Sequence, residues 1–178
     1  MDIELFEKLV TTPSYGHDVL KREQDVIKVI RKYIKKWLPN MNFYDDARAS
    51  IPYIFASASQ HPDIIFVCHA DTVSPSRKNH LKPIYNKDHC IVLGGKDMKG
   101  GMVAAIGALR ASLHDKAALL VYGDEEYNQQ GIIEMCKYLP KVLLKSPKII
   151  ICPESRFNLV HSSRGMSVFD VEIKGKRA

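Results

Sequence analysis

The stretch DIIFVCHAD, residues 63–71, is an apolar run that ends in a histidine and an aspartate. The same arrangement recurs downstream, where ALLVYG precedes Asp124-Glu125-Glu126 and KIIICP precedes Glu154. Near-continuous apolar runs of this length are typical of strands buried on both faces. Because the carboxyl ends of parallel strands meet at one edge of a sheet, we expect these polar side chains to share the crevice there.

Helical and strand patterns alternate around these runs. Four segments have helical patterns: 2–10, 18–37, 100–113 and 130–138. Strands are predicted within 42–68 and over 90–95, 116–123 and 146–153. This alternation indicates βαβ units, so we predict an α/β domain with a mostly parallel or mixed sheet and helices on both faces. Residues 158–175 alternate apolar with polar side chains, which predicts antiparallel strands.

Composition places the chain among globular proteins. Of its 178 residues, 46% are hydrophobic and 26% are charged, which argues against disorder or coiled coil. It contains no apolar run long enough for a membrane helix. The start, MDIELFEKLVTTPS, has acidic residues where a secretory signal carries positive charge. We therefore expect a cytoplasmic protein with no membrane partner.

The net charge of +6 raises the question of a nucleic-acid partner. The basic residues cluster in 21–37, but they alternate there with an apolar stripe of Val26, Ile27, Ile30, Ile34 and Trp37. This spacing indicates the solvated face of an amphipathic helix. We expect no nucleic-acid partner; binding through this helix is the alternative.

The four cysteines are widely spaced and form no C-x-x-C pair, so neither a zinc knuckle nor a disulfide is expected. Cys68 and Cys152 lie in apolar runs, where free cysteine behaves as a small buried hydrophobe. The alternative is a nucleophilic Cys68 beside His69.

The glycine-rich segment GGKDMKGG, residues 94–101, lies between a predicted strand and a predicted helix. It matches neither the P-loop nor the dinucleotide-binding pattern, and its central Asp97 would repel phosphate. We interpret the glycines as allowing a sharp turn that presents Asp97 to a cation.

One histidine and four acids are therefore candidates for a single metal site: His69, Asp97, Glu125, Glu126 and Glu154. Four carboxylates at one sheet edge would repel each other without a cation. One imidazole among carboxylates suits zinc, with cobalt or manganese as substitutes. Asp71 can accept the other imidazole N–H of His69 and fix its tautomer.

The adjacent pair Glu125 and Glu126 suggests a mechanism. Neighbouring side chains on a turning backbone point in different directions, so one can bind metal while the other faces the substrate as general base. A metal-activated water would then be the nucleophile.

Four motifs occur in a diagnostic order: HADTV at 69–73, GKDMKGG at 95–101, DEE at 124–126 and PES at 153–155. They resemble the zinc-dependent family of acetylornithine deacetylases, succinyl-diaminopimelate desuccinylases, aminoacylases and related carboxypeptidases. The resemblance implies that His69 binds one zinc, Asp97 bridges two, Glu154 completes the first site and Glu126 binds the second. It further implies that Glu125 is the general base and that Asp71 orients His69.

The resemblance also implies a catalytic α/β domain interrupted by a smaller α+β lid, through which family members often dimerise. We therefore assign 1–163 to the catalytic domain and 164–178 to the start of a lid. Family members are about twice as long and carry a further zinc-binding histidine near their C-terminus. His161 lies too early to match it, so we interpret the chain as the N-terminal half of such an enzyme.

The expected reaction is hydrolysis of the amide bond of an N-acylated amino acid, as in an acetylornithine deacetylase. A desuccinylase or a di- or carboxypeptidase is the alternative within the family. A catalytically incomplete fragment that binds only metal or a partner is the alternative outside it.

Overall fold

The computed structural model describes residues 2–15, 19–44, 49–76, 81–113, 115–143 and 146–152, with the isolated residues 158, 160 and 175. Glu154, His161 and, apart from Gly175, the predicted start of a lid at 164–178 lie outside the described residues. In the described part of the chain, no helix combines the length and apolarity needed to cross a membrane.

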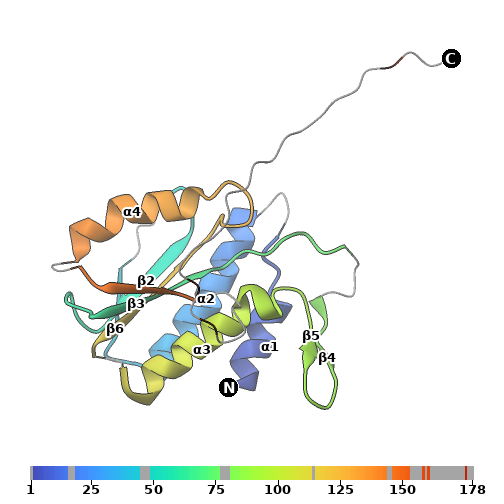
Figure 1. Cartoon of the computed structure of the whole chain (residues 1–178), viewed down its shortest axis with the longest axis horizontal. Coiled ribbons are helices and arrows are strands. Elements are labelled where there is room, and N and C mark those ends of the chain that lie inside the picture. The colour runs from blue at the N-terminus through green and yellow to red at the C-terminus, as the bar shows by residue number, and fades with distance from the viewer. Residues whose placement is uncertain are drawn as a thin grey trace.

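A five-stranded mixed sheet forms the centre of the fold (Figure 1). Its order is β1 (Asn42–Tyr44), β2 (Tyr53–Ser57), β6 (Ala117–Tyr122), β3 (Ile64–His69) and β7 (Lys148–Ile151). The strand β3 pairs in parallel with both β6 and β7, whereas β2 is antiparallel to β1 and β6. The sheet confirms the predicted mixed α/β class.

Helices cover both faces of the sheet, as predicted. One face packs against α1 (Ile3–Thr11), α2 (Val19–Trp37) and α3 (Gly100–Ala108), and the other packs against α4 (Gln130–Val142) (Figure 1). Alternate residues of β6 explain this division: Leu119 and Val121 join the core under α1–α3, while Leu120 and Tyr122 join the core under α4. Central strands with both faces covered produce the continuous apolar runs in the sequence.

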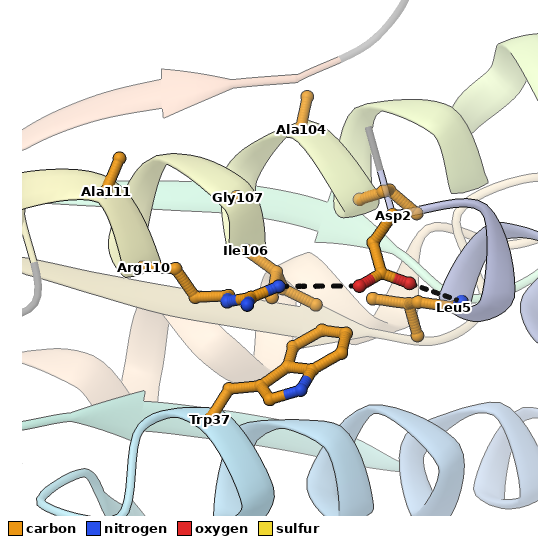
Figure 2. A pocket seen from close by; sticks show the side chains of 9 residues that line it. Asp2, Leu5, Trp37, Ala104, Ile106, Gly107, Arg110 and Ala111 are labelled. Atoms are coloured by element: carbon orange, nitrogen blue, oxygen red, sulfur yellow. Dashed lines mark hydrogen bonds and ion pairs between the residues drawn. The ribbon is translucent and has the colours of Figure 1, made fainter.

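Contacts at the helix ends hold α1, α2 and α3 together. Asp2 caps α1 by accepting the Leu5 N–H at 3.0 Å, and it also lies 3.4 Å from the Arg110 guanidinium. Arg110 belongs to the further helical turn Leu109–Leu113 after α3, and its guanidinium lies 4.2 Å from the centre of the Trp37 ring. These residues line a groove of about 700 Å³ between the three helices (Figure 2).

The predicted strand over 90–95 is wrong beyond its first two residues. Only β5 (Cys90–Ile91) is extended, and it pairs with β4 (Ile84–Tyr85) in a separate hairpin. The chain then turns, because Gly94 has a φ of +69° and the Gly95 N–H donates to the Val92 carbonyl. Residues 95–99 continue this turn into α3.

The prediction that 148–151 would be buried on both faces is also wrong. In the part of the chain that the structure describes, β7 is an edge strand, and Ile149, Ile150 and Ile151 are 60%, 43% and 66% exposed. The helix α4 packs over β6 instead, so it leaves the side chains of β7 uncovered.

Candidate metal centre

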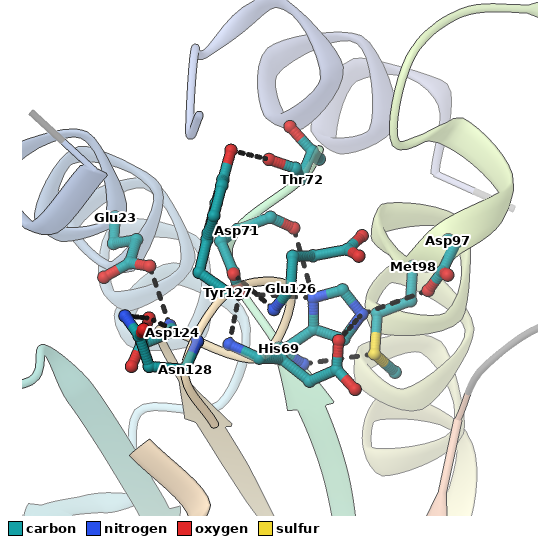
Figure 3. Close-up of polar contacts among 11 residues, drawn as sticks. Glu23, His69, Asp71, Thr72, Asp97, Met98, Asp124, Glu126, Tyr127 and Asn128 are labelled. Atoms are coloured by element: carbon teal, nitrogen blue, oxygen red, sulfur yellow. Dashed lines mark hydrogen bonds and ion pairs between the residues drawn. The ribbon is translucent and has the colours of Figure 1, made fainter. Parts of the chain in front are cut away.

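His69, Asp71 and Glu126 lie at the carboxyl ends of β3 and β6, and Asp97 joins them from the turn before α3 (Figure 3). His69 is the last residue of β3, and in the parallel register it lies opposite Tyr122, the last residue of β6. The Ala70 N–H donates to the Tyr122 carbonyl at 2.8 Å, which keeps the two chains together past the strands. The turn that carries Glu125 and Glu126 therefore begins beside the imidazole.

His69, Asp97 and Glu126 form a cluster of three possible ligands. The Nε2 atom of His69 is 3.0 Å from Oδ1 of Asp97, and one donor atom from each residue lies within 4.8 Å of the other two. Glu125 is adjacent, with Oε2 3.9 Å from the same Nε2. Imidazole nitrogen and carboxylate oxygen are both ligand types that zinc accepts, and three protein ligands would leave a fourth position open.

Asp71 contacts the other side of His69. The Nδ1 atom of the imidazole lies 3.1 Å from the main-chain oxygen of Asp71 and 3.4 Å from its carboxylate Oδ1. A proton on Nδ1 satisfies both contacts and directs the Nε2 lone pair toward the cluster. This is the tautomer that would allow Nε2 to bind a metal ion.

The charges around His69 favour its protonated form when no metal is bound. Burial alone lowers its pKa, but hydrogen bonds to Asp71 and Asp97 and the charge of Glu125 raise it to about 10. The hydrogen bond from His69 in turn lowers the pKa of Asp97. A proton on His69 thus supplies positive charge beside the carboxylates, and a metal ion bound to Nε2 would have to displace it.

Asp71 also fixes the acidic turn. Its carboxylate is fully buried, and it accepts the Glu125 N–H at 3.2 Å and the Glu126 N–H at 2.8 Å. Lys99, which is 1% exposed, places a counter-charge near Asp71 while its ammonium donates to the Thr12 carbonyl at 2.9 Å. Burial lowers the pKa of Lys99 to about 8.

Met98 ties the turn that carries Asp97 to the end of β3. The His69 N–H donates to the sulfur of Met98 at 3.1 Å, and the Met98 side chain is 1% exposed. A cis peptide bond joins Asp97 to Met98. Met98 therefore contacts the main chain of His69 and is bonded directly to Asp97, which keeps the imidazole and the Asp97 carboxylate close together.

Sequence reasoning missed Glu23, a fully buried residue of α2. Its Oε1 accepts the Asp124 N–H at 2.8 Å, so two buried carboxylates bind three successive N–H groups of the Asp124-Glu125-Glu126 turn. A Cβ on Gly123 would lie 2.2 Å from the Glu23 carboxylate, so only glycine allows this approach. The signal was present: Glu23 precedes Ile27 by four residues and therefore falls on the apolar stripe of the helix.

The stability of the metal-free chain should depend on Glu23. Burial and the charges of Asp71 and Asp124 raise its pKa from 4.5 to about 7. Between these values the native carboxyl keeps a proton that the unfolded chain has lost, so stability falls as pH rises, by roughly 3 kcal/mol at most. We expect Glu23→Gln to remove this part of the pH dependence.

Urea unfolding in EDTA at pH 5 and pH 8 measures the effect. Wild type should lose more stability between the two pH values than Glu23→Gln does. Equal losses in the two proteins would contradict the assignment.

Cys68 fits the prediction of a small buried hydrophobe. It is fully buried in the core under α3. A hydrogen bond with Cys152 and burial both raise its pKa well above the usual range, which disfavours the thiolate that a nucleophile needs. The nucleophilic alternative loses its support.

The structure thus brings five of the six predicted site residues to one edge of the sheet: His69, Asp71, Asp97, Glu125 and Glu126. The sixth, Glu154, follows β7, whose carboxyl end points to the same edge, but it lies outside the described residues.

No protein-family model matches the sequence, and no curated protein matches it. Solved structures do match. The M20 family metallo-carboxypeptidase Sso-CP2 from Sulfolobus solfataricus superposes with a TM-score of 0.64 at 14% identity over 85% of this chain. Human carnosine dipeptidase 1 gives 0.56 at 15% identity, and the dipeptidase Dug1p from Saccharomyces cerevisiae gives 0.61 at 13%, each over 84%.

The chain spans 37% of the length of each of these three proteins. At such identities the likeness establishes a shared fold, which in this chain is a mixed five-stranded sheet between helices.

Proposed function

We propose that this chain carries the metal-binding part of a zinc-dependent hydrolase that cleaves amide bonds in N-acylated amino acids. The observation that carries the proposal is the His69, Asp97 and Glu126 cluster with Glu125 beside it. The fold shared with metallo-carboxypeptidases and dipeptidases supports metal-dependent hydrolysis. Those neighbours make dipeptides the second substrate class to test.

The position of each residue indicates its role in the proposed reaction. His69, Asp97 and Glu126 would hold zinc, which polarises a carbonyl and lowers the pKa of a water molecule when it is bound. The carboxylate of Glu125 is about one-third exposed, so it can reach both water and substrate. Glu125 accepts the proton of the attacking water and delivers it to the leaving nitrogen, which releases a carboxylate and an amine.

Asp71 and Glu23 position these groups. Asp71 holds the imidazole of His69 and two N–H groups of the acidic turn, and Glu23 holds the third. A general base must stay within hydrogen-bond reach of its water, so a turn fixed before metal arrives lowers the cost of assembling the site.

The whole chain, stripped of metal and titrated with zinc or cobalt, tests the proposal. Turnover should be assayed on N-acetylornithine, an N-succinylated amino acid and dipeptides. We expect one or two zinc ions per chain and hydrolysis of at least one class. Stoichiometric metal with no turnover would instead favour the second candidate function, a protein that binds metal without catalysis. This candidate is considered because the chain spans only 37% of the length of its structural neighbours.

His69→Ala should weaken zinc binding about a hundredfold. Zinc sites with four ligands are worth roughly 10–16 kcal/mol, or about 3 kcal/mol per ligand. Competition with a fluorescent chelator measures the affinity. The matched control is His61→Ala, which removes an exposed histidine from a turn at the far end of β3. Equal affinities in the two variants would exclude His69 as a ligand.

The proposal includes no nucleic-acid partner. Two basic residues of α2 pack on a neighbouring ring: the Arg31 guanidinium lies 4.8 Å and the Lys35 ammonium 5.8 Å from the centre of the Phe43 ring. Lys28 pairs with Asp25 at 2.8 Å on the exposed face of the helix. Retention on DNA at low salt that disappears as salt rises would contradict this part.

A further inference from the structure

Two cysteines meet across the β3–β7 strand pair. Val67 lies opposite Ile151, and the Cys152 N–H donates to the Val67 carbonyl at 3.1 Å, so the ladder continues past the last paired residues. One step further along this register, Cys68 comes opposite Cys152. The two sulfurs lie close enough to shift each other's pKa, and the Cys152 thiol also lies 3.6 Å from the Ile150 carbonyl oxygen.

Both side chains point to the same face of the sheet. Cys68 belongs to the core under α3, and Cys152 packs against that core from a partly exposed position. The backbone of α3 packs directly on Cys152 at Gly101. A Cβ added to Gly101 would lie 3.3 Å from Cys152 Cβ and 2.0 Å from the Cys152 carbonyl oxygen, so the two segments are in close contact. Cys152 is thus held against the strand pair and has a nearby sulfur as its neighbour.

We propose that Cys68 and Cys152 form a reversible disulfide, an oxidative modification site beside the metal cluster. Hydrogen peroxide would oxidise the partly exposed sulfur of Cys152 to a sulfenic acid and release one water. The Cys68 thiol would then attack it and pass its proton to the leaving oxygen, so that no free thiolate is needed: the S–O bond breaks, the S–S bond forms and a second water leaves. The two thiols lose two electrons in total, and the peroxide is reduced to two waters.

A disulfide between Cys68 and Cys152 would affect the strand ends that carry the metal cluster. Neighbouring strands lie about 4.8 Å apart, which is within the roughly 4.4–6.8 Å that separates the Cα atoms of a disulfide. The bond would therefore form across the ends of β3 and β7 and fix them to each other directly before His69. Because Cys152 is partly exposed, the bond belongs to the readily reduced, regulatory kind. The effect on metal rests on the proposed zinc site, whereas formation of the disulfide does not.

Mass spectrometry of the whole chain after treatment with one equivalent of hydrogen peroxide tests the site. We expect a loss of two mass units, a non-reduced peptide that links Cys68 to Cys152, and full reversal by dithiothreitol. The double variant Cys90→Ser/Cys136→Ser keeps both core cysteines and should still form the link. Cys152→Ser should abolish it.

A product with Cys152 overoxidised and Cys68 still free, or links confined to Cys90 or Cys136, would overturn the proposal. Zinc affinity is measured separately by chelator competition. It should be about tenfold weaker in the oxidised chain than in the reduced one, in the range found when groups supporting a ligand are disturbed. A disulfide with unchanged zinc affinity would overturn the regulatory part, and failure of the reduced chain to bind zinc would refute the zinc site alone.

Discussion

Replacing Glu125 by glutamine is expected to lower the hydrolytic kcat by about 10²–10⁴-fold while zinc binding stays close to wild type. Glutamine keeps the shape of the side chain and its place beside His69, but it cannot accept a proton from water. General acid–base catalysis contributes rate factors of this size. KM should change little, because the substitution removes a group needed for the chemical step.

Zinc content and kcat must be measured on the same preparations. Glu126→Gln is the informative companion, because it removes a candidate ligand and should reduce zinc affinity as well as turnover. Glu7→Gln controls for the loss of one negative charge. Glu7 is exposed, and its carboxylate accepts a hydrogen bond from the Tyr85 hydroxyl. If Glu125→Gln retained full activity with a full complement of zinc, Glu125 would not be the base.

Gly101→Ala is expected to destabilise the chain by about 3–5 kcal/mol, a large part of the stability of an ordinary domain. The new methyl group would meet the Cys152 carbonyl oxygen at 2.0 Å and its carbonyl carbon at 3.2 Å. A main-chain carbonyl cannot rotate away as a side chain can, so either α3 or the end of β7 must move.

The matched control lies in the same helix. Gly107 lies inside the helix α3 and lines the groove of Figure 2. A Cβ added to it would meet no atom within 4 Å. Gly107→Ala should therefore stabilise the chain by about 0.5–1 kcal/mol through helix propensity. Urea unfolding of the metal-free variants compares them. Similar stabilities would show that α3 does not approach Cys152 this closely.

The edge of the sheet that carries the site could be predicted from the sequence because each polar group directly follows its own apolar run. An apolar run that ends in His69, followed later by another that ends in two glutamates, needs only parallel pairing to bring the groups together. Asp97 was predicted from the glycines around it. These residues could be found without knowing any long-range contact.

Other features depend on tertiary packing and could not be read from periodicity. An apolar run does not reveal whether its strand is central or at an edge, so the exposure of β7 was missed. The helix α4 continues to Val142, past the predicted end at 138, with Pro140 in its last turn. Glu23 gains its role from a glycine a hundred residues away.

The strand order has a consequence for synthesis on the ribosome. β2 and β3 do not pair with each other, because β6 lies between them and supplies the partner for both. Residues 53–69 therefore leave the exit tunnel well before 117–122 exist, and such non-local pairing is slow and prone to aggregation. Until β6 emerges, the nascent chain has to keep two strongly apolar strands from pairing with the wrong neighbour.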